Sequence, residues 1–359
     1  MTDIIIIGGG IAGVSAAATL SHHASVTLLE AEPQLGYHAS GRSAAMFLAD
    51  YGNAVVKELN YASRDHHQKA NGGVLSKRGT MLIGRPSERD DFANEFAAFG
   101  MAEISMKEAR AHVPILHPEN AAFAAYREDA FDLDADRLLQ NYTAEARRNG
   151  ANIVTGSPVR KITKSGEKWD VLAGDSTYAT PVLVNAAGAW VDEIAKLAQI
   201  HPLGFQPYRR SIARLPAPGG HDVSTWPFID GVHERWYAKP DAGHWIVSPS
   251  EEHAVDPHDA WADDMVLAEG LERYSEMVTE PVTRLQTSWA GLRTFAPDRA
   301  LVIGRDASDP SFYWLAGQGG YGFQTAPAAS QLIADLVLGR TSELQAETVR
   351  ALSPIRFST

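Results

Sequence analysis

Residues 4–13 read IIIIGGGIAG, and the segments that follow them complete a short supersecondary unit. Four β-branched residues in a row are typical of a central parallel strand that is buried on both faces. The glycines match the GxGxxG pattern, and residues 14–20 are rich in alanine and compatible with a helix. Residues 26–29 form a second apolar segment that ends at Glu30. The stretch therefore predicts a βαβ unit of the kind that binds a dinucleotide.

Three glycines of this motif are required for steric reasons. Gly8 permits the tight turn, Gly10 lets a pyrophosphate approach the backbone, and Gly13 lets the helix pack against the strand. We expect the N–H groups at the helix start to bind the pyrophosphate, and the carboxylate of Glu30 to accept hydrogen bonds from the ribose hydroxyls. Further cofactor contacts are expected from Ile11, Ala12 and Ala31. A glycine-rich turn without a ligand is the alternative interpretation.

The composition limits the classes of protein that the chain can belong to. With 359 residues, of which 45% are hydrophobic and 21% charged, it has the size and balance of a globular protein of about two domains. The net charge is −12 and no Lys/Arg-rich tract is present, which argues against a nucleic-acid partner. The chain has no cysteine, and its 13 histidines lack metal-ligand spacing, so we expect no metal site.

Residues 4–20 are the only stretch that resembles an export signal or a membrane span. A signal peptide begins with basic residues, whereas Asp3 precedes this stretch, and four glycines fall in its first half. We therefore expect no membrane span and a cytoplasmic location.

The segment after the acidic strand end favours FAD over NAD. Residues 36–45, GYHASGRSAA, are a loop of small residues with one arginine and two serines, where NAD-binding domains usually continue with a helix and a strand. Together with Glu30, this loop resembles the D-amino-acid oxidase and dehydrogenase family of FAD flavoproteins, which place such a loop along the pyrophosphate and the isoalloxazine. The resemblance implies cofactor contacts from Ser40, Gly41, Arg42, Ser43, Ala44 and Ala45. We expect noncovalent binding, because no cysteine is available for attachment.

Two later segments support the resemblance. Residues 182–190, VLVNAAGAW, read as a strand that runs into small residues, and residues 312–325 read as a strand and a glycine loop before a helix over 326–338. A helix start that points at the flavin pyrimidine would stabilise the negative charge of reduced flavin. The family likeness implies contacts from Val159, Ala187, Gly188, Trp190, Gly319, Gly320, Tyr321, Gly322, Phe323 and Gln324.

The remaining sequence predicts a second, sheet-based domain. No second GxGxxG with an acidic strand end occurs, so we expect no NAD(P)H domain. The predicted fold class is α/β, a Rossmann-like FAD-binding domain with a β-sheet-based (α+β) substrate domain. Strands are expected at 79–84, 121–126, 209–215, 235–239 and 244–249, with a hairpin turn at 239–243. The expected division is 1–75, 145–205 and 291–359 for the FAD-binding domain and 76–144 with 206–290 for the substrate domain.

A closer resemblance, to the bacterial D-arginine dehydrogenases, extends over nearly the whole chain. It rests on residues 36–51, 185–192, 207–211, 237–243, 289–295 and 318–325. The resemblance implies that Arg293 and Arg210 hold the substrate carboxylate, because a guanidinium binds a carboxylate through two parallel hydrogen bonds. It also implies that Tyr51 and Tyr237 line the pocket and that Gly320 lies in the site, although each tyrosine ring is compatible with a place in the core.

Two positions depart from that pattern. Met46 stands where those dehydrogenases have a histidine, and Thr80 stands where they have the acid that recognises a guanidinium. Without that acid, a buried cation would lose its hydration without gaining a partner, so we expect neutral or hydrophobic side chains. A carboxylate from another strand, such as Glu234 or Asp230, would remove this reason.

These features predict oxidative deamination of D-amino acids, with hydride transfer to flavin N5 and an imino acid that hydrolyses to a 2-oxo acid and ammonia. An amine has only to lose an ammonium proton, whereas a hydroxy acid needs a base such as histidine, so Met46 favours amines. The alternatives are a 2-hydroxy-acid oxidase, an N-methyl-amino-acid oxidase, or an inert flavoprotein. The electron acceptor, whether a quinone, an electron-transfer protein or O₂, is left open.

Overall fold

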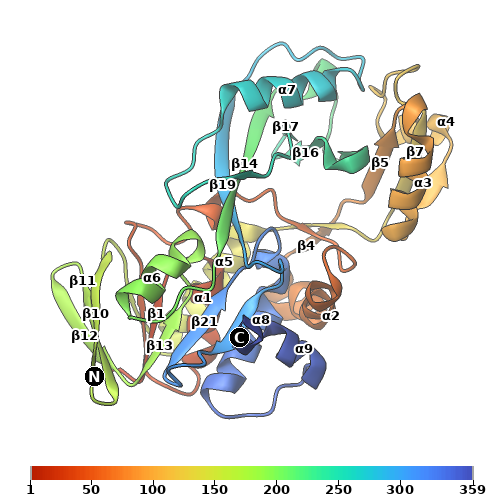
Figure 1. Cartoon of the computed structure of the whole chain (residues 1–359). Helices are drawn as coiled ribbons and strands as arrows, with labels where there is room; N and C mark the ends of the chain where they lie inside the picture. Colours follow the sequence, from red (N-terminus) through yellow and green to blue (C-terminus); the bar gives the residue numbers. More distant parts are fainter. Residues whose placement is uncertain (1, 358–359) are drawn as a thin grey trace.

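The computed structural model describes residues 2–357 and has an α/β fold with two large sheets, one in each half of the molecule (Figure 1). The first sheet has six strands in the order β20-β21-β13-β1-β2-β9. Their bounds are β1 Ile4–Ile7, β2 Val26–Leu29, β9 Asn152–Val154, β13 Val182–Asn185, β20 Val302–Arg305 and β21 Phe312–Ala316.

The motif at the start of the chain forms the centre of this sheet. Strand β1 pairs in parallel with β2 on one side and β13 on the other, and all four of its residues are buried. Helix α1, Ile11–Leu20, follows directly and begins three residues before the predicted start. The predicted βαβ unit is confirmed.

Alternate residues of β1 belong to two different cores, as the period of a strand requires. Ile4 and Ile6 pack under helices α1, α2, α5 and α8, whereas Ile5 and Ile7 pack under α6 and an antiparallel three-stranded sheet. The elements on the two faces are α2 Ala54–Lys69, α5 Ala135–Arg148, α6 Val191–Leu197, α8 Gly322–Val337, β10 Val159–Ser165, β11 Lys168–Ala173 and β12 Ser176–Thr180. A small sheet of β3 Met46–Phe47, β8 Phe131–Leu133 and β4 Leu75–Lys77 lies beside them, and α9 Ala346–Leu352 follows α8.

The second sheet has nine strands, in the order β18-β14-β17-β16-β15-β5-β7-β6, with β19 paired to β14. The long strands β14 and β19 run from this sheet down toward the first one (Figure 1). Their bounds are β5 Thr80–Gly84, β6 Ala102–Ile104, β7 Phe123–Arg127, β14 Gln206–Leu215, β15 Phe228–Gly231, β16 Tyr237–Asp241, β17 His244–Ser248, β18 His253–Ala254 and β19 Thr287–Phe295. Helices α3 Arg89–Ala98, α4 Met106–His112 and α7 Asp264–Ser275 accompany it.

The hairpin between β16 and β17 corrects one detail of the prediction. The turn consists of Ala242 and Gly243, both with positive φ, while Pro240 lies inside β16 opposite Trp245. Two central residues with positive φ form a type I′ turn, whose twist matches that of the flanking strands. Gly243 therefore serves the turn, whereas Pro240 does not.

The domain boundaries drawn from the sequence remain a prediction, and the packing of helix α5 argues against one of them. Helix α5 contributes Leu138, Tyr142 and Ala146 to the core that also contains α1. We therefore propose to move the boundary drawn at 144/145 to near residue 130.

No helix within residues 2–357 is long and apolar enough to cross a membrane.

Candidate functional site

A cavity of about 610 Å³ lies between the two sheets and is lined by residues of both. Ligand sites of enzymes commonly have volumes of this order. One end is bounded by the glycine motif and the end of β2, and the other by β5, β15 and β16. The two ends differ in chemistry, the first offering backbone amides and the second charged side chains.

The glycine motif shapes the first end. Gly8 has a φ of +112°, and a Cβ atom there would lie 2.3 Å from the carbonyl oxygen of Ala186. A Cβ on Gly13 would lie 1.9 Å from the Gly8 carbonyl, so Gly13 lets α1 pack against the end of β1. A Cβ on Gly10 would have only Ser40 Oγ near it, at 3.2 Å. The backbone of Gly10 is therefore accessible from the cavity.

Two backbone amides at the start of α1 have no acceptor among the described residues. Ser40 Oγ accepts the N–H of Ile11 at 3.0 Å, and the Gly10 carbonyl accepts that of Val14. Within residues 2–357 no protein group accepts the N–H of Ala12 or Gly13. Free amides at a helix start are suited to a pyrophosphate, and the carboxylate of Glu30, held by the N–H of Glu32 at 2.8 Å, lines the same end.

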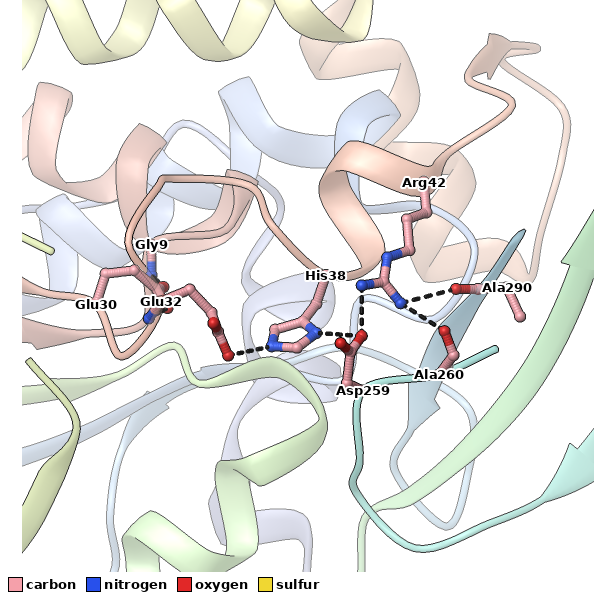
Figure 2. A network of polar contacts seen from close by, with 8 residues as sticks. All are labelled: Gly9, Glu30, Glu32, His38, Arg42, Asp259, Ala260 and Ala290. Carbon is pink, nitrogen blue, oxygen red and sulfur yellow. Dashed lines mark hydrogen bonds and ion pairs between the residues drawn. The ribbon is translucent and has the colours of Figure 1, made fainter. Parts of the chain in front are cut away.

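The loop over 36–45 is fixed by Arg42 (Figure 2). Its guanidinium donates to the carbonyls of Ala260 and Ala290, at 2.7 and 3.1 Å, and pairs with Asp259 at 2.5 Å. From Asp259 the chain of polar contacts continues through His38 to Glu32, near the end of β2 (Figure 2). Arg42 therefore ties the cofactor loop to β19 and to the segment before α7.

The second glycine segment, residues 317–322, meets the cavity where α8 begins. Within the described residues the N–H groups of Gly322, Phe323 and Gln324 have no protein acceptor, as at α1. A Cβ on Gly320 would lie 3.2 Å from Cζ of Arg293, so the bare backbone packs against the guanidinium. Helix α8 starts four residues before the predicted 326, and this brings its free amides to the cavity.

Arg293 stands on the cavity wall with no protein partner. It lies on β19, opposite Tyr208 of β14, and no group within residues 2–357 forms a hydrogen bond or an ion pair with its guanidinium. Burial opposes its charge, but the hydroxyls of Tyr51 and Tyr237 and the carboxylate of Glu234 outweigh burial and raise its pKa. The guanidinium therefore remains charged and available to an anionic ligand.

Arg210 lies on the neighbouring strand β14 and is only 6% exposed. Its Nη2 approaches Glu252 at 3.5 Å, a carboxylate that Arg299 binds at 2.9 Å, and its Nε has no acceptor. Burial and the charge of Arg293 lower the pKa of Arg210. Two guanidinium groups on adjacent strands make this end of the cavity attractive to a carboxylate.

Tyrosines complete this part of the wall. Tyr51 and Tyr237 both line the cavity, and burial raises the pKa of the Tyr51 hydroxyl, which remains a hydrogen-bond donor. Tyr321 does not line the cavity, but its ring contacts that of Tyr51 with centroids 5.3 Å apart.

Three carboxyl groups line the far end of the cavity, and the expectation of neutral side chains remains a prediction. Asp230 lies on β15, next to Leu82 of β5 and Tyr237 of β16, while Glu95 comes from α3 and Glu234 from the turn before β16. Burial, Glu234 and Glu95 raise the pKa of Asp230 well above its ordinary value, and burial raises that of Glu95. Asp230 Oδ1 has no hydrogen-bond partner.

The sequence analysis named two of these acids as residues that could reach the pocket, but it did not identify Glu95. Glu234 and Asp230 were considered because the strands near them could turn toward the pocket. No motif marks Glu95, since its position depends on α3 packing beside β5, and its carboxylate accepts the N–H of His233 at 2.9 Å. His233 and Glu234 both have positive φ, in the turn that carries Glu234 to the cavity.

The predicted site residues come together with few exceptions. Met46 and Thr80 line the same cavity, whereas Gly13, Gly41 and Tyr321 stand behind its surface. The predicted residues that line the wall are Gly8, Gly10, Ile11, Ala12, Glu30, Ala31, Ser40, Arg42, Ser43, Ala44, Ala45, Met46, Tyr51, Thr80, Val159, Ala187, Gly188, Trp190, Arg210, Tyr237, Arg293, Gly319, Gly320, Gly322, Phe323 and Gln324. Their individual contacts with a ligand remain predictions. No group of three or more metal-ligating side chains occurs within the part of the chain described.

Comparison with known proteins identifies the family. The model of the DAO family, described as FAD dependent oxidoreductase, matches residues 3–336. A tRNA 5-methylaminomethyl-2-thiouridine biosynthesis bifunctional protein of Pseudomonas putida is 26% identical over 99% of this chain. The chain spans 59% of the length of that protein. Monomeric sarcosine oxidase of Streptomyces avermitilis is 22% identical, with 95% of this chain and 94% of the oxidase covered.

Solved structures show the same fold. Glycine oxidase from Geobacillus kaustophilus superposes with a TM-score of 0.83 at 19% identity, over 99% of this chain and 98% of the oxidase. L-amino acid deaminase from Proteus vulgaris superposes with a TM-score of 0.80 at 16% identity, over 99% of this chain and 97% of the deaminase.

Proposed function

We propose that this chain, which belongs to the DAO family of FAD-dependent oxidoreductases, oxidises the α-carbon–nitrogen bond of D-amino acids. The observation that carries the proposal is the unpartnered guanidinium of Arg293, which lines the cavity together with Arg210 and packs against the backbone of Gly320. Such a group requires an anion, and the substrate carboxylate is the anion that an amino-acid oxidoreductase has to hold.

The side chains of the protein would bind and orient the substrate. Arg293 and Arg210 hold its carboxylate, and the Tyr51 hydroxyl, which stays protonated, donates a hydrogen bond to it. Bound FAD would supply the acceptor for the hydride of the α-carbon, and the resulting imino acid would be hydrolysed to a 2-oxo acid and ammonia. The substrate ammonium gives up one proton to water before the transfer.

Two classes of side chain are candidates at the far end. Met46, Leu82, Phe99 and Phe228 line the cavity and suit the neutral side chains that the sequence predicts. Glu95, Asp230 and Glu234 favour a cationic side chain, because a guanidinium or an ammonium would supply the partner that Asp230 lacks. A cationic side chain would have to ionise Asp230 and Glu95, whose pKa values burial raises, so the substrate panel decides between the two classes.

The decisive experiment is anaerobic bleaching of the bound flavin with a substrate panel. The panel contains D-Arg, D-Lys, D-Met, D-Leu and D-Phe, their L-enantiomers, 2-hydroxy acids and sarcosine, the last because one relative is a sarcosine oxidase. Rapid bleaching by D-amino acids supports the proposed reaction, and fastest bleaching by D-Arg or D-Lys supports the cationic candidate. If D-Met or D-Leu were faster, the neutral candidate would stand.

Other results would replace the proposal. Bleaching only by hydroxy acids, by secondary amines or by L-enantiomers would assign one of those reactions instead, and no bleaching by any compound would indicate an inert flavoprotein. Reoxidation of the reduced enzyme by O₂ or by a quinone then identifies the electron acceptor. Kinship with D-arginine dehydrogenases and a cytoplasmic location also remain predictions.

A further inference from the structure

Helix α2 buries a polar face, although it contributes no residue to the cavity wall. Asn60, Ser63 and His67 follow one another at intervals of three and four residues, so they lie on one side of the helix. Each of the three is 0% exposed. Burial of a polar side chain is unfavourable unless its groups are hydrogen-bonded, so the partners of these residues indicate their role.

Asn60 binds the segment that carries Tyr51. Its Nδ2 donates to the carbonyl of Tyr51 at 3.0 Å and to that of Ala49 at 3.3 Å. The two carbonyls flank one turn of backbone directly before α2, and the ring of Tyr51 extends from it into the cavity. Asn60 therefore fixes the backbone on which this tyrosine stands.

Ser63 and His67 bind the start of α8. Ser63 Oγ accepts the N–H of Ala328 at 3.1 Å, and His67 Nε2 donates to the carbonyl of Gln324 at 2.9 Å. These two groups surround Pro327, which has no N–H and disturbs the hydrogen bonds of the first turns of α8. Gln324 also accepts the N–H of Leu48 through its side chain, at 2.8 Å, and so joins α8 to the Tyr51 segment.

We infer that the polar face of α2, formed by Asn60, Ser63 and His67, positions two adjoining parts of the FAD site at once, the Tyr51 segment and the first turns of α8. Helices α2 and α8 lie side by side (Figure 1). Gly322, Phe323 and Gln324 line the cavity at the start of α8, and His67 and Ser63 bind the first turns of this helix. These three residues act through other groups and are positioning residues, not catalytic ones.

The test uses the holoenzyme and three variants, Asn60→Leu, Ser63→Ala and His67→Leu. His67→Gln retains a donor at the end of the side chain and serves as the conservative variant. His66→Gln is the matched control, because His66 lies next to His67 on α2, stacks on Tyr142 and contacts neither segment. Amide hydrogen exchange is followed in residues 322–328 and 48–52, with β1 as the reference.

We expect Ser63→Ala and His67→Leu to speed exchange in 322–328 by about tenfold or more, and Asn60→Leu to do so in 48–52, while β1 remains unchanged. Release of FAD from diluted holoenzyme, measured by flavin fluorescence, should accelerate several-fold in Ser63→Ala and His67→Leu but not in His66→Gln. In Asn60→Leu the KM for the amino acid should rise more than kcat falls.

Equal acceleration of exchange in β1 would show that the polar face serves only general stability and would overturn the inference. So would unchanged exchange in both segments together with unchanged FAD release. If His67→Leu fails to fold, the comparison of Ser63→Ala and His67→Gln decides, because the former removes an acceptor and the latter keeps the donor.

Discussion

Arg293 is the side chain on which the proposed binding of the substrate carboxylate depends most. It comes from β19, the backbone of Gly320 lies against it, and no protein group within residues 2–357 pairs with it. An ion pair within the described part of the protein is therefore excluded as the role of Arg293. The guanidinium is therefore free to bind an anionic ligand, and substitution of Arg293 tests this role.

We expect Arg293→Lys and Arg293→Ala to lower kcat/KM by an amount that corresponds to a loss of about 2–5 kcal/mol of transition-state stabilisation, because a bidentate charge-assisted contact is lost. FAD content, read from the ratio of flavin to protein absorbance, should be preserved. Arg209→Lys is the matched control, since Arg209 pairs with Asp263 away from the cavity. Equal kcat/KM in the Arg293 variants and the wild type would exclude Arg293 from the site.

Asp230 provides the sharper test of side-chain preference. Asp230→Asn keeps the shape of the residue but cannot ionise beside a cationic substrate, so kcat/KM for D-Lys should fall by roughly tenfold or more while that for D-Met changes little. Asp241→Asn, at the β16–β17 hairpin, is the control with the same chemical change. Thr80→Glu should raise the activity on D-Arg further. Parallel losses for D-Lys and D-Met would assign Asp230 to stability.

Among the elements, the turn between β1 and α1 combines two constraints at Gly8. Its φ of +112° disfavours any side chain, and a Cβ would also collide with Ala186 of the neighbouring strand end. Gly8→Ala should therefore lower the free energy of unfolding by more than the roughly 1–3 kcal/mol of backbone strain alone. Gly150→Ala has a φ of +85° and no neighbour within 4 Å, so it isolates the strain. Equal losses in denaturant titrations of the two variants would contradict the proposed collision.

The α2–α8 contact also makes stability depend on pH. Burial lowers the pKa of the His67 imidazole from 6.5 to about 4. At a pH between these two pKa values, His67 is protonated in the unfolded chain but not in the folded chain. The free energy of unfolding therefore falls as the pH falls from 6.5 to 4. The loss from this group reaches about 3 kcal/mol, at about 1.4 kcal/mol per pH unit.

His67→Gln should flatten the dependence of unfolding free energy on pH in that window. His66, the nearest other titratable group, also has a pKa that burial lowers, so it contributes in the same direction. His66→Gln measures this second contribution separately. Identical slopes in wild type and His67→Gln, from denaturant titrations at pH 4.5 and 6.5, would contradict the assignment.

At the scale of the whole molecule, local patterns predicted the FAD half well. The buried run at 4–7, the glycines and Glu30 lie within one short segment, so period and spacing suffice to place them. The prediction of β14 lacked its first three residues, and β19 was absent from the prediction, because the WAGLR stretch around Arg293 has no clear alternation. Glu95 entered the site through the packing of α3, which no local pattern encodes. The side-chain preference depends on such long-range packing, and for that reason it remains a prediction.

The cavity between the two sheets makes the cofactor part of the stability of the whole molecule. Residues from both sheets line it, so we expect bound FAD to contact the two halves and to favour the folded state by mass action. FAD at a hundred times its Kd should stabilise the protein by about 2.7 kcal/mol, and the Tm of the holoenzyme should rise with added FAD. The chain has no cysteine for attachment, so acid precipitation should release all flavin into the supernatant. Yellow colour in the washed pellet would demonstrate a covalent bond, and a Tm independent of FAD would show that the flavin does not join the two halves.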